Sequence, residues 1–270
     1  MACTVVTAYY PIRSKFSKDR YMEWASTFLR MESPIVLFTE ESMVHDIRQR
    51  RGTLPIRIIT IPFYELDTWQ RYQPQWMEHY ELDPEKSIHS PELYAIWAQK
   101  AFFVERAIQA NPFQTDFFFW CDIGAFRDPH VSSVILNSFP RCHYLESERI
   151  LLQSVGNLMA TDWAQREDGI RGEVISNAWN EIRLVGGLWG GGAAACIRWK
   201  NAYQRMLDAY FRAGRFAGKD QQVMLSTYLD DPTLAKVVHC TKSYTDEWFF
   251  LEHLLSDQSE RYELNLTYSV

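Results

Sequence analysis

A single carboxylate follows the most apolar stretch of the sequence. Residues 116–124 read Asp-Phe-Phe-Phe-Trp-Cys-Asp-Ile-Gly, so bulky side chains lead up to Asp122, and Gly124 follows it closely. Such a run predicts a strand that is buried on both faces of a parallel sheet. Open α/β sheets bind ligands outside the carboxyl ends of their strands. Asp122 is therefore a candidate ligand of Mg²⁺ or Mn²⁺ or part of a phosphate site, and an Asp that only caps a strand is the alternative.

The loop over residues 9–15 follows the first predicted strand and should reach the same edge of the sheet. A tyrosine in this loop could stack on a base. Arg13 or Lys15 could meet a diphosphate, because both carry the opposite charge. An exposed loop with ordinary surface charges is the alternative interpretation.

A glycine-rich run, residues 186–192, precedes a predicted helix. Glycine permits positive φ and close approach to a ligand, and a helix N-terminus favours anions. The run matches neither a dinucleotide fingerprint nor a P-loop. A tight turn between a strand and a helix explains one or two of the glycines, but not five.

Two further side chains could take part in chemistry. Asp220 opens a predicted helix, where it either caps the helix or points its carboxylate into a cleft. His239 ends the last predicted strand, and is either a metal ligand or a partly buried histidine with an ordinary partner.

Strands alternate with helices along the chain. This order predicts an α/β fold in which helices flank a mostly parallel central sheet, within one domain. The expected strands are 4–8, 35–38, 56–61, 117–121, 183–189 and 234–239, and the expected helices are 17–31, 39–50, 90–109, 128–137, 190–213, 218–229 and 246–255. Residues 62–90 read as a long irregular binding loop. Residues 141–182 have no clear assignment.

Composition narrows the class of protein. The net charge of −6 and the lack of a long basic run argue against a nucleic-acid partner. The five cysteines include no Cys-x-x-Cys pair, which fits reduced thiols better than disulfides or zinc. The N-terminus has no basic region before an apolar one, and no apolar run reaches the ~18 residues of a membrane span. We therefore expect a cytoplasmic protein without a membrane span.

Several blocks of the sequence together resemble the HtrL/YibB-like family of bacterial glycosyltransferases. The aromatic block around Asp122 is the most specific. The other blocks occur in the family's order, namely 7–10, 38–40, 111–113, 186–191 and Asp220-Gln221, and the resemblance covers about residues 4–240. It implies a GT-A glycosyltransferase fold that is Rossmann-like, with a nucleotide-binding half over about 1–125 and an acceptor half over about 126–270.

The resemblance also implies roles for particular residues. A nucleotide-diphosphate sugar, with a UDP-sugar favoured, would donate its sugar to a glycan or another hydroxyl acceptor, assisted by Mn²⁺ or Mg²⁺. The metal ligands would be Asp122 and His239, although Gly124 stands where the family's Asp-x-Asp motif has its second Asp. The expected donor-binding residues are Thr7, Ala8, Tyr9, Arg13, Lys100, Asp122, Gly124, Gly187 and Lys242.

Catalysis of glycosyl transfer would need charge stabilisation at the leaving diphosphate and a base for the acceptor hydroxyl. Asp122 is our candidate for the first role and Asp220 for the second. Trp69, Trp76 and Trp189 are candidates for stacking on acceptor sugars, with core packing as the alternative for each. A phosphohydrolase with an Asp nucleophile and an inactive sugar-binding module are the two alternative functions.

Overall fold

The computed structural model describes residues 2–127, 132–172, 182–240, 247–257 and 266–268. The strands of this part are β1 Cys3–Tyr9, β2 Ile35–Thr39, β3 Ile56–Thr60, β4 Phe117–Cys121, β5 Ile150–Ser154, β6 Leu188–Gly192, β7 Ala235–Cys240 and β8 Leu266–Tyr268. The α-helices are α1 Lys18–Phe28, α2 Val44–Arg51, α3 Asp67–Leu82, α4 Pro91–Ala110, α5 Ser132–Ser138, α6 Ala160–Trp163, α7 Ala193–Ala213, α8 Asp220–Asp230 and α9 Phe250–Leu254. Short 3₁₀ helices are η1 Glu41–Met43, η2 Phe63–Glu65, η3 Cys142–Tyr144, η5 Pro232–Leu234 and η6 Glu247–Phe249.

The strands of the described residues form one sheet in the order β3-β2-β1-β4-β6-β5-β7-β8. Strands β3, β2, β1 and β4 are parallel to one another, and β5 is parallel to β7. Strand β6 runs antiparallel between β4 and β5, and β8 is antiparallel at the edge. A mostly parallel sheet within one domain confirms the predicted fold class, and its first four strands have a Rossmann-like order.

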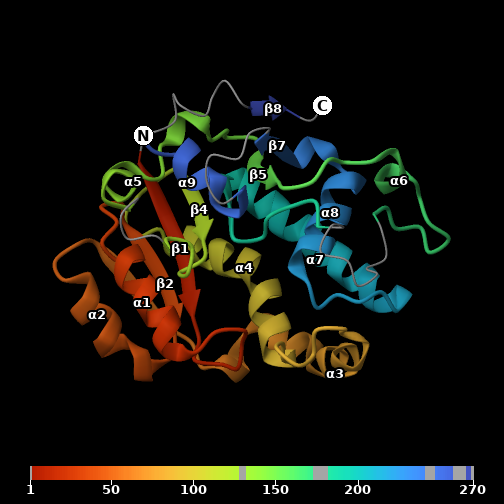
Figure 1. The fold of residues 1–270 in the computed structure, drawn as a ribbon, viewed down its shortest axis with the longest axis horizontal. Coiled ribbons are helices and arrows are strands. Elements are labelled where there is room, and N and C mark those ends of the chain that lie inside the picture. Colours follow the sequence, from red (N-terminus) through yellow and green to blue (C-terminus); the bar gives the residue numbers. More distant parts are fainter. Residues whose placement is uncertain (1, 128–131, 173–181, 241–246, 258–265, 269–270) are drawn as a thin grey trace.

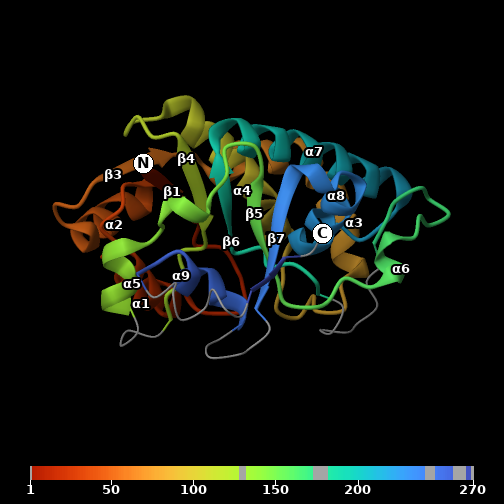
Figure 2. The ribbon, with the colours of Figure 1, turned by 90° about the horizontal axis from the view of Figure 1, so that it is seen from above.

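Helices cover both faces of this sheet (Figures 1 and 2). Seen from above in Figure 2, α4 and α7 lie on one side of the strands, whereas α1, α5 and α9 lie on the other. Alternate residues of one strand serve the two faces: Phe118 and Trp120 pack in the core beneath α4 and α7, and Phe119 packs in the core beneath α1 and α9. The aromatic run is thus buried on both sides, as the sequence predicts.

Two predicted helix starts are confirmed by their capping bonds. The Ser17 side chain accepts a hydrogen bond from the backbone N–H of Arg20, and the Ser90 side chain accepts one from Leu93. The helix expected to begin at residue 39 instead begins at Val44, as α2. Thr39 is the last residue of β2, and its hydroxyl donates to the carbonyl of Tyr9 at 2.6 Å.

Three expectations about the elements are corrected by the structure. Residues 62–90 are not a long irregular loop, because α3 spans Asp67–Leu82 with Pro74 inside it. The unassigned region contains strand β5, whose signal was the apolar run at Ile150. The strand expected at 183–189 is instead β6, which starts at Leu188 and includes the last three glycines, so the helix begins only at Ala193.

Close packing explains why glycines form strand β6. A Cβ at Gly190 would lie 2.3 Å from the carbonyl oxygen of Phe118, and one at Gly192 would lie 2.7 Å from Cα of Ser147. A side chain at either position would therefore clash with the backbone of a neighbouring segment. This part of the glycine run serves strand packing and does not approach a ligand.

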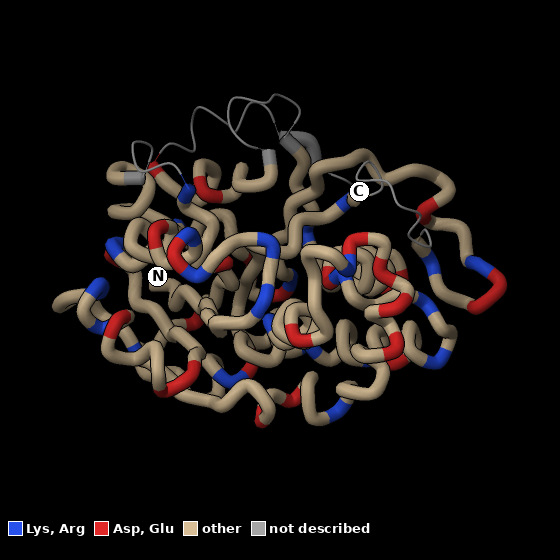
Figure 3. Tube along the Cα trace, turned by 60° about the horizontal axis from the view of Figure 1, so that its bottom comes forward, with Lys and Arg blue, Asp and Glu red and all other residues tan. Residues whose placement is uncertain are grey.

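Basic and acidic residues are interspersed along the chain (Figure 3). No helix of the described residues combines the length and the apolar composition needed to cross a membrane.

Candidate functional site

The carboxyl ends of β1 and β4 border a cleft. The chain proceeds from β1 outward to β2 and β3, and then returns to place β4 on the other side of β1. Such a switch in strand order is where α/β sheets bind ligands. Tyr9 ends β1 and Asp122 directly follows β4, and both line the cleft.

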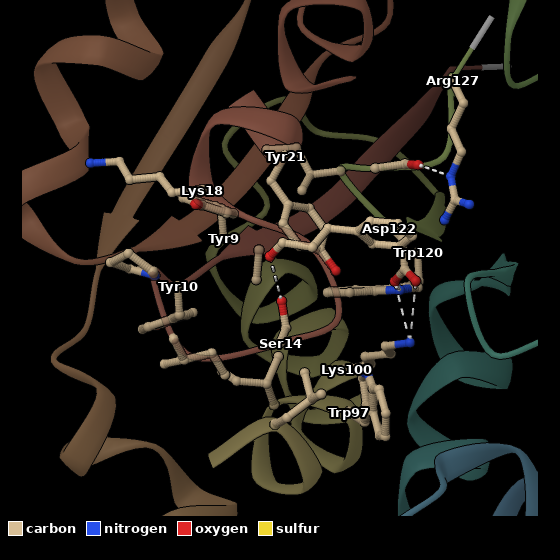
Figure 4. A pocket seen from close by; sticks show the side chains of 18 of the residues that line it. Tyr9, Tyr10, Ser14, Lys18, Tyr21, Trp97, Lys100, Trp120, Asp122 and Arg127 are labelled. Carbon is tan, nitrogen blue, oxygen red and sulfur yellow. Dashed lines mark hydrogen bonds and ion pairs between the residues drawn. The ribbon is translucent and has the colours of Figure 1, made fainter. Parts of the chain in front are cut away.

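The cleft has two lobes that share a wall containing Lys100, Asp122 and Arg127. The first lobe has a volume of about 210 Å³ and lies beside the loop that follows β1. Figure 4 shows Tyr9 and Tyr10 across this lobe from Asp122, with Tyr21 and Ser14 between them. Its lining is largely aromatic and aliphatic, so it suits a flat, partly apolar group.

The second lobe is larger, with a volume of about 350 Å³, and more charged side chains line it. Its own lining residues include Lys15, Glu85, His89, Gly186, Gly187, Lys219, Asp220, Gln221 and Trp248. Carboxylates, an imidazole and amines on one wall suit a ligand rich in hydroxyl groups.

A compact ion-pair cluster stands where the lobes meet. The ammonium of Lys100, on α4, lies 3.3 Å from Oδ1 of Asp122 and 3.0 Å from Oδ2 of Asp220, at the start of α8. Lys100 also donates to the carbonyl of Gly186 at 3.0 Å. The indole N–H of Trp120 donates to Oδ1 of Asp122 at 2.7 Å. Residues far apart in the sequence thus hold one another in place.

Exposure differs sharply within this cluster. The side chain of Asp122 is 40% exposed to the cleft, whereas those of Lys100 and Asp220 are 8% and 7% exposed. Asp122 is therefore the member of the cluster that a ligand can reach most directly. Lys100 and Asp220 are more deeply buried, and Lys100 contacts both carboxylates.

The cluster shifts the pKa of two of its members. Loss of solvent raises the pKa of the Asp122 carboxyl, although Lys100 and the N–H of Trp120 oppose this. Burial alone would lower the pKa of Lys100, but the two carboxylates outweigh it and raise that pKa. Lys100 therefore stays charged at neutral pH. With both carboxylates ionised, the cluster has one more negative than positive charge, which favours a cationic or metal-bound ligand group.

Arg127 is a candidate ligand-binding residue that motif reasoning missed. Its guanidinium lies 4.6 Å from the ring centre of Trp24 and 4.7 Å from that of Phe249, and its Nε donates to the carbonyl of Gly124 at 3.0 Å. Figure 4 shows it beside Asp122. A cation held between aromatic rings at the junction of the lobes can meet an anionic ligand. Only its place in the aromatic block, five residues after Asp122, hinted at this.

The chain resembles a curated protein over nearly its whole length. Protein HtrL of Escherichia coli (strain K12) is 22% identical to it over 273 aligned residues, which cover 92% of this chain and 90% of that protein. The chain is similar to HtrL along most of both sequences. This supports the family indicated by the sequence blocks, while no family model matches the sequence.

Six of the nine expected donor-binding residues line the cleft, two do not, and one lies outside the described residues. Of the six, Asp122 borders both lobes. Ala8, Tyr9, Lys100 and Gly124 border the first lobe, and Gly187 borders the second. Thr7 is fully buried inside β1 and lines neither lobe. Arg13 also lies outside both linings and donates to the carbonyl of Ser87 at 2.8 Å. Lys242 lies outside the described residues.

The tryptophans expected to stack on acceptor sugars do not line either lobe. Trp76 and Trp189 are 0% and 1% exposed and belong to the core between the sheet and its helices. The alternative of core packing is therefore correct for both. Trp69 is partly buried, and its ring packs 4.8 Å from that of Phe63. Trp97 and Trp248 line the second lobe instead.

The two residues expected to bind a metal are not brought together at the cleft. His239 lines neither lobe, and its Nδ1 lies 3.0 Å from the hydroxyl of Ser154. Among the described residues, no group of three or more His, Cys, Asp and Glu side chains is arranged to hold a metal ion. A divalent cation would therefore rely on Asp122, which has an accessible carboxylate. Mg²⁺ often binds in this way, through one or two carboxylates and substrate phosphates.

Gly186 and Gly187 are the part of the glycine run that serves the site. A Cβ at Gly186 would lie 2.7 Å from Oδ2 of Asp220, and one at Gly187 would lie 3.0 Å from Oδ2 of Asp122. The backbone N–H of Asp122 also donates to the carbonyl of Gly187 at 2.8 Å. Their missing side chains let the two carboxylates sit against this backbone.

This difference within the glycine run gives a paired prediction. We expect Gly186→Ala to displace the Asp220 carboxylate and lower activity by about tenfold or more, since small misplacements in a site are costly. Its melting temperature should change little, because the carboxylate is a side-chain end that can move. Gly190→Ala should instead lower the melting temperature strongly, because its Cβ meets backbone. Thermal unfolding and activity of both variants would check this, and equal melting temperatures would contradict it.

Proposed function

We propose that this protein is a glycosyltransferase that moves a sugar from a nucleotide-diphosphate sugar to a hydroxyl acceptor. The observation that carries the proposal is the two-lobed cleft at the carboxyl edge of the sheet, whose lobes meet at Asp122 and Lys100. A donor of this kind has a flat base at one end and a polyhydroxylated sugar at the other, with a diphosphate between them. The family resemblance points in the same direction.

The first lobe suits the nucleoside end of such a donor. The backbone of Ala8 and Tyr9 continues the edge of β1 into the loop that borders this lobe, and Pro11 and Ile12 add an apolar wall. Burial raises the pKa of Tyr9 to about 12 and also raises that of Tyr21, so both phenols stay neutral hydrogen-bond donors at neutral pH. A UDP-sugar is the favoured donor.

The diphosphate would lie at the junction, beside Asp122, Lys100 and Arg127. As the bond between sugar and diphosphate breaks, negative charge develops on the leaving oxygen and must be stabilised. Arg127 can donate two parallel hydrogen bonds to a phosphate. Mn²⁺ or Mg²⁺ held by Asp122 and the donor phosphates would neutralise the rest of this charge. Lys100 keeps Asp122 ionised and correctly placed for that contact.

The second lobe suits the transferred sugar and its acceptor. Asp220 borders this lobe from α8, and its ion pair with Lys100 links the acceptor side to the donor side. The carboxylate of Asp220 could accept a hydrogen bond from a sugar hydroxyl or a proton from the acceptor. Asp220→Asn keeps the shape of the side chain and can still accept a hydrogen bond, but it cannot take a proton. This variant would therefore separate the two roles.

Ligand-induced stabilisation tests the proposal. A ligand that binds only the folded state raises the melting temperature. We expect UDP, or a sugar derivative of UDP or GDP, to raise it in the presence of Mn²⁺, and a chelator to reduce the rise. Asp122→Asn should abolish the Mn²⁺-dependent part. No shift with any nucleotide, with or without Mn²⁺, would contradict the proposal.

Two alternative functions give different results. A phosphohydrolase would release phosphate from simple phosphoesters, but the position of its general acid or base, two residues after the nucleophile, is occupied by Gly124. A sugar-binding module would bind nucleotide sugars or glycans without turning them over. Release of nucleoside diphosphate distinguishes the transferase from both.

A further inference from the structure

A buried set of hydrogen-bonded side chains ends at the second lobe. The carboxylate of Asp83 is fully buried between α3 and α4, and its Oδ2 lies 2.8 Å from Nδ1 of His89. The hydroxyl of Tyr94 donates to the same oxygen at 2.5 Å, and the backbone N–H of Glu85 donates to the other oxygen at 2.8 Å. Nothing in the family resemblance or in the proposed roles uses this set.

The set determines which ring nitrogen of His89 is left for a ligand. Because Nδ1 is held by Asp83, Nε2 is the nitrogen left for a ligand, and among the described residues it has no hydrogen-bond partner. The ring is also held at its edges, with its centre 5.1 Å from that of Trp97 and 6.3 Å from that of Tyr94. His89 lines the second lobe together with Asp122 and Lys100.

The surroundings of Asp83 favour its ionised, negatively charged form. Burial alone would raise the pKa of Asp83, but hydrogen bonds from His89, Tyr94 and the Glu85 backbone outweigh this and lower it. An ionised Asp83 keeps the proton of a neutral imidazole on Nδ1 and leaves a lone pair on Nε2. It would also stabilise the imidazolium that forms when Nε2 takes a proton.

We propose that His89, oriented by Asp83, is the general base for the acceptor hydroxyl, an inference that rests on the proposed glycosyl transfer. The acceptor hydroxyl gives its proton to Nε2 while its oxygen forms a bond to the anomeric carbon of the sugar. The bond from that carbon to the diphosphate breaks, and the nucleoside diphosphate leaves with the electron pair. His89 then returns its proton to water.

This assignment moves the role of base away from Asp220. The side chains of Asp220 and His89 are similarly buried, at 7% and 9% exposed, but the Asp220 carboxylate is already paired with the Lys100 ammonium, whereas His89 Nε2 has no competing partner among the described residues. The other charged groups of the same lobe are Lys15, Glu85, Lys100, Asp122, Arg127, Lys219 and Asp220. Glu85 and Lys219 are paired with each other, so their charges offset.

The pH dependence of donor turnover tests the inference. Wild type, His89→Gln and Tyr94→Phe are compared with the nucleotide sugar from a UDP- and GDP-sugar panel that wild type turns over, and UDP binding is measured separately. For His89→Gln we expect kcat to fall about 100-fold, with KM for the donor and UDP affinity unchanged, because general bases contribute about that much. Any acid limb in the pH profile of the wild-type rate should also disappear in this variant.

Tyr94→Phe serves as the matched control. It removes one hydrogen bond from the same buried carboxylate and leaves Nε2 of His89 in place. We expect it to lower the melting temperature while keeping most of kcat and the acid limb of the pH profile. If His89→Gln behaves like Tyr94→Phe, the set is only a structural brace and the inference is wrong. If wild type turns over no donor, the proposed function fails and the inference fails with it.

Discussion

Replacing Asp122 by Asn is expected to lower donor turnover by about 100-fold or more, because an electrostatic contact at the leaving group is lost. Asn keeps the size of the side chain but removes the negative charge that lies 3.3 Å from Lys100 and that would hold the metal and diphosphate of the proposed reaction. The fold should survive, since 40% of the Asp122 side chain is exposed. Release of nucleoside diphosphate and the melting temperature are the two measurements.

A matched control exists on the same strand. Asp116 is exposed just before the opposite end of β4, and it lines neither lobe of the cleft. Asp116→Asn should therefore keep wild-type turnover. Turnover that survives Asp122→Asn, or that falls equally in both variants, would show that the site has been misplaced.

Replacing Lys100 by Met is expected to damage both stability and activity. It leaves Asp220, 7% exposed, and Asp122 without their shared cation. Removing one partner from a buried ion pair typically costs about 3–5 kcal/mol of the free energy of unfolding. Asp122 would also lose the contact that keeps it ionised, so turnover should fall with stability.

The stability lost in Lys100→Met should depend on pH in a defined direction. Burial raises the pKa of the Asp122 carboxyl and Lys100 opposes this, so without Lys100 that pKa should rise further above its unfolded value. The folded variant then binds more protons than its unfolded state, so its stability increases as the pH falls through that raised pKa. Urea unfolding at neutral and mildly acid pH would measure this.

Lys200→Met is the matched control for that variant. Lys200 lies 3.0 Å from Glu105, with side-chain exposures of 12% and 21%, in a pair that joins α7 to α4 away from the cleft. A single, more exposed pair should cost less than the central one, and turnover should persist. Equal losses of stability in the two variants would contradict the central role given to Lys100.

Local patterns in the sequence determine much of the fold. The aromatic run before Asp122 predicts a doubly buried strand because only such a strand can hide consecutive large apolar side chains, and β4 has this environment. The Ser90-Pro91 pair predicts the start of α4 because a capping hydroxyl followed by proline suits a first helical turn. These signals lie within a few residues of the structure that they specify.

Other features depend on contacts between distant segments, which a single sequence does not display. Gly190 and Gly192 belong to a strand because β4 and the segment before β5 approach them too closely for a Cβ. Strand β6 also runs antiparallel to β4 and β5, which no local pattern in the glycine run indicates. The sequence does not predict helix α3, because Pro74 lies inside it and its apolar residues have no clear helical period.

The residues of the candidate site also fall into two groups, those that a local sequence pattern indicates and those that only the fold reveals. Asp122 and Asp220 are candidates because of their positions after a strand and at the start of a helix, and Lys100 is one through the family resemblance. Their meeting around one ammonium could not be foreseen, because they come from the end of β4, from α4 and from α8. His89 and Arg127 gave no motif signal. Each becomes a candidate only through a buried partner or an aromatic setting that the fold supplies.

Turnover of a nucleotide sugar by the purified wild-type protein tests the central claim most directly. A panel of UDP- and GDP-sugars is incubated with the protein and Mn²⁺, and free nucleoside diphosphate is measured with and without sugar acceptors. The structure predicts release from at least one donor, which Asp122→Asn abolishes. A folded protein that binds these donors but releases no nucleoside diphosphate, or that instead releases phosphate from simple phosphoesters, would contradict it.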